Sequence, residues 1–113
     1  MNTKDKGDRL VLMLRDEARA RDLDFLKVRA SGHMGRRGGI PADAVVAGWR
    51  VEAKNRKRGL GTRAIEDILT KGEVHAVLHH RDRGLPLVTL ALNDWLDLLA
   101  RLAKAAERAG KEA

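Results

Sequence analysis

The fold is predicted mainly from one stretch, Asp43-Ala-Val-Val-Ala-Gly-Trp-Arg-Val-Glu52-Ala-Lys54. Two short apolar runs flank Gly48-Trp49, and a glycine in the first position of a two-residue turn favours a type II′ β-hairpin. The register that follows pairs Ala47 with Arg50, Val45 with Glu52, and Asp43 with Lys54.

Side chains of a strand alternate between the two faces of a sheet. The hairpin therefore presents Asp43, Glu52 and Lys54 on one face. The opposite face is apolar and can pack on a helix; it carries Ala44, Val46, Val51 and Ala53.

Two carboxylates and one ammonium group on a rigid face suggest a Mg²⁺-dependent phosphodiesterase site. Mg²⁺ prefers oxygen ligands, keeps several waters and often takes substrate phosphate as a further ligand. We expect Asp43 and Glu52 to bind the metal, with the backbone carbonyl of Ala53 as a further ligand. Lys54 would orient the attacking water or neutralise the transition state. The alternative is an ordinary charged surface hairpin, in which Lys54 forms a salt bridge to Asp43 or Glu52.

The composition points to a polyanionic partner. The chain has 113 residues, 23 Lys and Arg against 16 Asp and Glu, and a formal net charge of +7. Nucleic acid is the simplest such partner, and an anionic membrane surface is the weaker interpretation, because the basic residues do not follow one amphipathic helix. The chain contains no cysteine, which favours a reducing cytoplasm.

Hydrophobic periodicity predicts a single α/β domain over residues 1–113, with residues 1–6 and 110–113 frayed. The element order is αβββαββα, a mixed sheet flanked by helices. The predicted elements are a helix over 8–20, a strand over 25–30, the 43–55 hairpin, a helix capped by Thr62 and ending near Lys71, strands over 74–80 and 87–92, and a helix capped by Asn93. The apolar stripe of the last helix is Trp95, Leu98, Leu99, Leu102 and Ala106.

This order, with Asp43 and Glu52-Ala-Lys54 on the second and third strands, resembles the restriction-endonuclease-like PD-(D/E)xK superfamily. Within it the chain resembles the archaeal-type Holliday junction resolvases, which also occur in phages. The resemblance covers roughly residues 4 to 95. Its motifs are Lys6-Gly7-Asp8-Arg9, Val28-Arg29-Ala30-Ser31-Gly32, Pro41-Ala42-Asp43 and Val51-Glu52-Ala53-Lys54-Asn55-Arg56-Lys57.

The resemblance implies further site residues. Asp8 would be the catalytic acid of the first helix, where the family usually has Glu; it could equally be a helix N-cap. Arg9, Arg29 and Ser31 would contact the phosphate beside the cut. Pro41-Ala-Asp43 stands where the family has a compact Pro-Asp.

Six further basic residues lie on or beside glycine-containing loops near the proposed site, where a DNA strand can approach closely. They are Arg36, Arg37, Arg56, Lys57, Arg58 and Arg63. Few aromatic residues are available for base stacking, so recognition by shape and charge is expected. The histidines His75, His79 and His80 are interpreted as surface or phosphate-contacting residues.

The resulting hypothesis is a homodimeric, Mg²⁺-dependent Holliday junction resolvase, in which Mn²⁺ would substitute for Mg²⁺. A two-fold dimer would supply two equivalent sites for symmetric nicks. The helix over 62–71 and the strand over 74–80 are the first candidates for the dimer surface, followed by the helix of Trp95. The alternatives are another nuclease of the superfamily (a nickase, flap nuclease or restriction-type enzyme) and a non-catalytic basic protein on a decayed nuclease fold.

Overall fold

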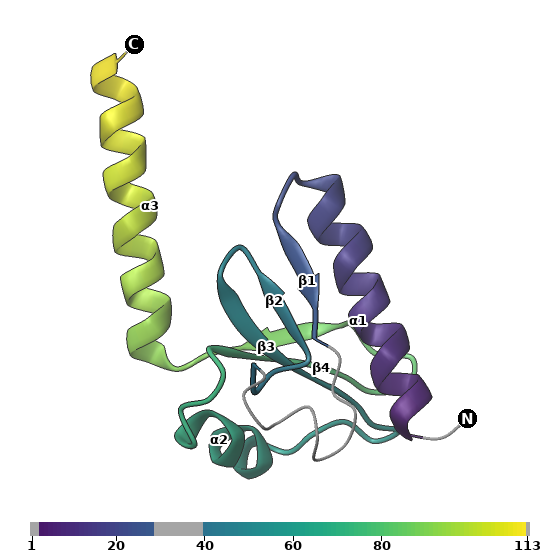
Figure 1. Ribbon diagram of the computed structural model, residues 1–113. Coiled ribbons are helices and arrows are strands. Elements are labelled where there is room, and N and C mark those ends of the chain that lie inside the picture. Colours follow the sequence, from purple (N-terminus) through teal and green to yellow (C-terminus); the bar gives the residue numbers. More distant parts are fainter. Residues whose placement is uncertain (1–2, 29–39, 113) are drawn as a thin grey trace.

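The computed structural model describes residues 3–28 and 40–112. Within these residues the chain forms three helices and one five-stranded mixed sheet. Figure 1 shows this α/β arrangement. The order αβββαββα is the predicted one. The elements are α1 (Thr3–Ala20), β1 (Phe25–Lys27), β2 (Ala44–Val46), β3 (Trp49–Asn55), α2 (Thr62–Thr70), β4 (Ala76–His80), β5 (Leu87–Thr89) and α3 (Leu92–Glu112).

The five strands lie in the sheet in the order of the chain, β1-β2-β3-β4-β5. β3 and β4 are parallel, and every other neighbouring pair is antiparallel. A parallel pair needs a crossover, and α2 provides it between β3 and β4. The carboxyl ends of β3 and β4 therefore lie together at one edge of the sheet.

The turn of the β2–β3 hairpin is formed by Ala47-Gly48, so the predicted turn at Gly48-Trp49 is wrong by one residue. Both turn residues have positive φ, 48° and 85°, which is the type I′ geometry that fits the twist of the flanking strands. The observed pairs are Ala44 with Val51, Val45 with Arg50, and Val46 with Trp49. Trp49 thus belongs to β3, where its ring lies 5.2 Å from that of His75.

The shifted turn leaves each residue on its predicted face, because it changes each cross-strand partner by two residues, which is one full period of a strand. The apolar face of the hairpin packs on α1, as predicted. Leu10 and Val11 of the helix are buried against a cluster on the sheet, formed by Ala44, Val51, Ala53 and Leu78. Phe25 and Val46 extend this cluster at its margin.

The helix α2 contacts β4, and its Ile65 is buried. It begins at Thr62 with Gly61 as N-cap, so the prediction that Thr62 caps the helix is wrong by one residue. β4 begins at Ala76 rather than at residue 74. It lies between β3 and β5 with Ala76, Val77 and Leu78 buried. The strand over 74–80 therefore cannot be the dimer surface predicted for it.

β5 ends at Thr89, three residues before the predicted end, because Leu92 already begins α3. The N–H of Trp95 donates to the carbonyl of Ala91, which places Asn93 inside the helix rather than at its cap. α3 projects away from the sheet (Figure 1), and α1 and α3 continue through residues 3–6 and 110–112, for which fraying is predicted. Among the described helices, none is long and apolar enough to cross a membrane.

Candidate active site

Asp43 directly precedes β2 and is held against β3 by two hydrogen bonds. Its backbone N–H donates to the carbonyl of Val51 over 3.0 Å. Its carboxylate oxygen Oδ2 accepts a hydrogen bond of 2.8 Å from the N–H of Ala53. The side chain is thus fixed in orientation by the strand that carries the other two predicted catalytic residues.

Glu52 and Lys54 lie two residues apart on β3 and share the face of Asp43. The Nζ of Lys54 is 3.6 Å from Oε1 of Glu52, and their side chains are 29% and 23% exposed. Burial raises the pKa of the Glu52 carboxyl above its ordinary value of 4.5, and the negative charge of Asp43 raises this pKa further. The ammonium of Lys54 acts in the opposite direction. The Glu52 carboxylate is therefore held beside Asp43 in a place where its negative charge is costly.

The donor atoms fit a hard divalent cation. Asp43 and Glu52 offer carboxylate oxygens, and Mg²⁺ is commonly held by one or two carboxylates together with water and phosphate. The N–H and C=O of one strand residue project to the same side of the strand. Because the N–H of Ala53 bonds to Asp43, the carbonyl of Ala53 is also directed to the side where Asp43 lies.

Asp8 is half-buried on α1, the helix that covers the opposite face of the sheet. Within residues 3–28 and 40–112, no group of three or more His, Cys, Asp or Glu side chains is arranged to hold a metal ion. The structure thus brings Asp43 and Glu52 together and does not bring Asp8 into a three-carboxylate group with them.

The basic residues Arg56, Lys57 and Arg58 directly follow β3, two residues beyond Lys54. Lys57 and Arg58 are exposed, and Arg56 is half-buried with its N–H donating to the carbonyl of His80. Arg63 is exposed on the first turn of α2, and Arg9 is exposed on α1. A run of cations therefore begins at the end of the strand that carries Glu52 and Lys54.

Sequence reasoning missed one residue beside this site, Arg81, and interpreted a second, His79, only as a surface or phosphate-contacting residue. Arg81 follows β4 and lines a hollow of about 370 Å³ together with Arg58. His79 pairs in register with Lys54 on the parallel strand, and its Nε2 lies 2.8 Å from Oγ1 of Thr89. Only the pairing of β3 with β4, which no local pattern encodes, places them here.

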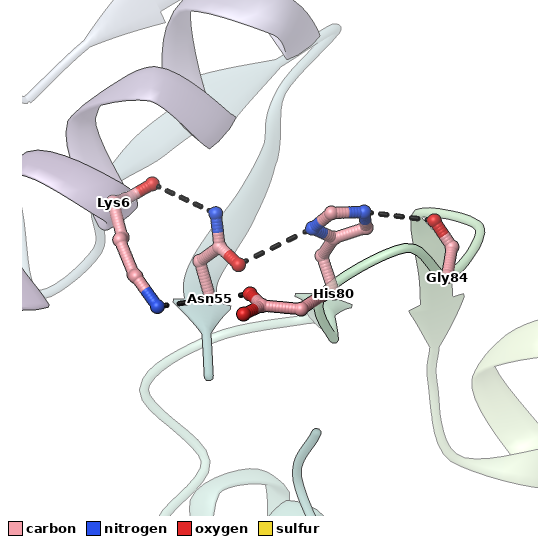
Figure 2. A network of polar contacts seen from close by, with 5 residues as sticks. Lys6, Asn55, His80 and Gly84 are labelled. Carbon is pink, nitrogen blue, oxygen red and sulfur yellow. Dashed lines mark hydrogen bonds and ion pairs between the residues drawn. The ribbon is translucent and has the colours of Figure 1, made fainter. Parts of the chain in front are cut away.

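A chain of polar contacts fixes the carboxyl ends of β3 and β4 relative to α1 (Figure 2). The Nδ2 of Asn55 donates to the carbonyl of Lys6 over 3.2 Å, and Oδ1 of Asn55 lies 3.2 Å from Nδ1 of His80. The Nε2 of His80 is 2.8 Å from the carbonyl oxygen of Gly84, and Lys6 also pairs with Asp82 at 3.6 Å. His80 is therefore half-buried and structural rather than a surface residue.

Four predicted site residues lie outside the described residues: Arg29, Ser31, Arg36 and Arg37. Their roles stay predictions from the sequence.

Comparisons of the chain with protein-family models, with curated proteins and with solved structures found no match. The function is therefore inferred from the chemistry and geometry of the site residues.

Proposed function

We propose that the protein is a metal-dependent, structure-selective DNA endonuclease of the restriction-endonuclease-like type, acting as a Holliday junction resolvase. The observation that carries the proposal is the cluster of Asp43, Glu52 and Lys54 on one sheet face, beside the cations that begin at Arg56. Phosphodiester hydrolysis needs this combination of an oxygen-rich metal site and positive charge for the DNA backbone.

Asp43 and Glu52 would hold Mg²⁺, with the carbonyl of Ala53 as a further ligand. When bound, Mg²⁺ supplies an activated water and neutralises charge on the phosphate. Lys54 lies beside Glu52, so its ammonium can orient that water or stabilise the pentacoordinate phosphorus. The hydrogen bond from the N–H of Ala53 fixes Asp43, and such fixed orientation is what a metal ligand requires.

The second candidate function is a non-catalytic basic protein that binds branched DNA. One feature of the sequence favours it: the chain departs from the resembled family at Asp8, where the family usually has Glu, and at Pro41-Ala-Asp43. Other nucleases of the superfamily, such as a nickase or a flap nuclease, share the chemistry and differ in substrate.

The test is incubation of the full chain with Mg²⁺ and matched four-way, three-way, flap and linear DNAs. We expect paired nicks in the four-way junction and little cutting of linear DNA. Glu52→Gln and Asp43→Asn should each abolish cleavage while junction binding stays equal or becomes tighter, because a negative charge near phosphate is removed. Glu66→Gln, an exposed carboxylate on α2, is the matched control and should cleave normally.

Full Mg²⁺-dependent activity in both variants would contradict the assignment of the active site. Binding without cutting by the wild type, in Mg²⁺ and in Mn²⁺, would favour the non-catalytic protein. Equal cutting of linear and branched DNA would favour a general nuclease.

A further inference from the structure

α3 carries an apolar surface that is exposed among the described residues, 3–28 and 40–112. Its large side chains Leu92, Trp95, Leu96, Leu99 and Leu102, here called the α3 stripe, are 65%, 45%, 47%, 41% and 57% exposed. The helix spans 21 residues and projects away from the sheet (Figure 1). An apolar surface of this size on an otherwise charged helix is typical of a contact site.

The side of α3 that faces the domain is a different one. Asp94, Asp97, Leu98 and Arg101 line a hollow of about 310 Å³ opposite the β2–β3 turn. Each residue of an α-helix is rotated by about 100° from the one before it, which places the centre of the α3 stripe on another side of the helix from Asp94, Asp97 and Arg101. The contact between α3 and its own domain thus leaves the α3 stripe open.

Six apolar positions along one side of α3 recur at spacings of three and four, which is the pattern of a helix that pairs with another helix. They are Leu92, Trp95, Leu99, Leu102, Ala106 and Ala109. The bulky members are all in the first half of the helix, and the small ones are all in the second half.

This division by size favours an antiparallel pair. With the two-fold axis midway between Leu99 and Leu102, Trp95 faces Ala106 of a second copy, and Leu92 faces its Ala109. Trp95 and Leu92 then each meet a small side chain, and Leu99 meets Leu102 of the second copy at the centre, so the two helices pack at even spacing along their length. A parallel pair would oppose two tryptophans at one end and two alanines at the other.

The charges of α3 favour the same arrangement. Its first half carries Asp94 and Asp97 with no basic residue, and the part from Arg101 onward has four basic and two acidic residues. An antiparallel pair sets the acidic half of each helix beside the basic half of the other, and it also opposes the two helix dipoles favourably. The early aspartates make an anionic membrane the weaker occupant.

We propose that a second copy of this chain docks on the α3 stripe, forming a two-fold dimer through antiparallel pairing of the two α3 helices. The proposal identifies the surface of the dimer on which the proposed function rests. Its test needs neither DNA nor metal, so it can fail or succeed independently of the nuclease assignment.

The first experiment is sedimentation of the full chain at micromolar concentrations. The wild type should have the mass of two chains, and Leu99→Glu should reduce it to the mass of one. Ala100→Glu adds the same charge one residue away on the polar side of α3 and should remain a dimer. Circular dichroism checks that the variants keep their helix content. A monomeric wild type, or a dimer that survives Leu99→Glu, would overturn the proposal. Binding of a monomeric wild type to anionic vesicles would assign the α3 stripe to a membrane.

The second experiment determines the direction of pairing by disulfide formation, since the chain has no cysteine of its own. Trp95→Cys and Ala106→Cys should form a mixed disulfide when the two variants are combined. Neither should crosslink to itself, because residues 11 positions apart on a helix are separated by about 16 Å, well beyond disulfide range. Efficient self-crosslinking of Ala106→Cys would show parallel pairing, and no crosslink in either sample would place the interface elsewhere.

Discussion

The Asp43–Glu52 pair places two carboxyl groups close together at half-buried positions. Burial is the largest cause that raises the pKa of Glu52. Lys54 compensates in part, from a distance of 3.6 Å. A bound cation or a bound proton would relieve the remaining repulsion, so we expect this site to couple stability to pH and to metal.

The sign of the pH effect follows from the raised pKa of Glu52. The folded state binds a proton there more tightly than the unfolded state does. The stabilisation from that proton is fully present below about pH 4.5 and is lost as the pH rises through the folded-state pKa. Without divalent ions, Glu52→Gln should therefore melt at a higher temperature than the wild type at pH 7. The difference should shrink towards pH 4, as thermal unfolding in EDTA would measure.

Saturating Mg²⁺ should make the wild type melt at a higher temperature than Glu52→Gln, the reverse of the order expected in EDTA. A ligand at a hundred times its dissociation constant stabilises the folded state by about 2.7 kcal/mol, so saturating Mg²⁺ should raise the melting temperature of the wild type. Glu52→Gln should respond far less, and Glu66→Gln should respond like the wild type. If Mg²⁺ raised the melting temperature equally in all three proteins, Glu52 would not be a ligand of the metal.

At the scale of elements, the carboxyl ends of β3 and β4 organise the site. The parallel pairing sets Lys54 beside His79 and Asn55 beside His80, and the contacts of Figure 2 hold this edge against the start of α1. The loop that begins at Arg56 emerges from this edge, which places its cations next to the carboxylates.

The salt dependence of DNA binding tests this element. Each backbone phosphate contact contributes about 0.9 to the slope of log K against log salt on duplex DNA. Replacing Lys57 and Arg58 together by Ala should reduce the slope by up to about 2 on this basis. Replacing Arg19 and Lys71 by Ala removes the same charge from exposed positions near the ends of α1 and α2, and should leave the slope nearly unchanged. An unchanged slope in the first variant would place the DNA-binding face elsewhere.

At the scale of the whole molecule, the chain measures 51 × 28 × 27 Å and has a core of small residues. Val77 is fully buried, and much of the remaining core is alanine and valine, whereas the large side chains of the α3 stripe are exposed. A small domain of this kind gains stability by association. The same association would give two nuclease sites at a fixed separation.

Coordinated cutting tests this dependence. A supercoiled plasmid that extrudes a cruciform is linearised when both strands are cut in one encounter, whereas a single nick relaxes the plasmid and removes the substrate. The wild type and Ala100→Glu should yield mainly linear product. Leu99→Glu should yield mainly nicked circles, because a single copy provides a single site. Linear product from a protein that sediments as a monomer would contradict this account.

Three features could be predicted from the sequence alone. They are the element order, the two faces of the hairpin, and the shared face of Asp43, Glu52 and Lys54. These depend on local periodicity, and the strand period of two survives even the one-residue error in the position of the turn. The type I′ turn at Ala47-Gly48 was missed because alanine rarely adopts positive φ, whereas Gly48 fits either turn.

Which strands pair and which apolar faces are covered depends on long-range contacts, so these features could be read only from the tertiary structure. The parallel register of β3 and β4 brings His79 and Arg81 to the site, and it buries the strand predicted as a dimer surface. The stripe of α3 has the same periodicity as a core-facing helix, and its exposure depends on where the chain leads the helix after β5. Periodicity shows that a face is apolar, but the path of the chain determines what that face meets.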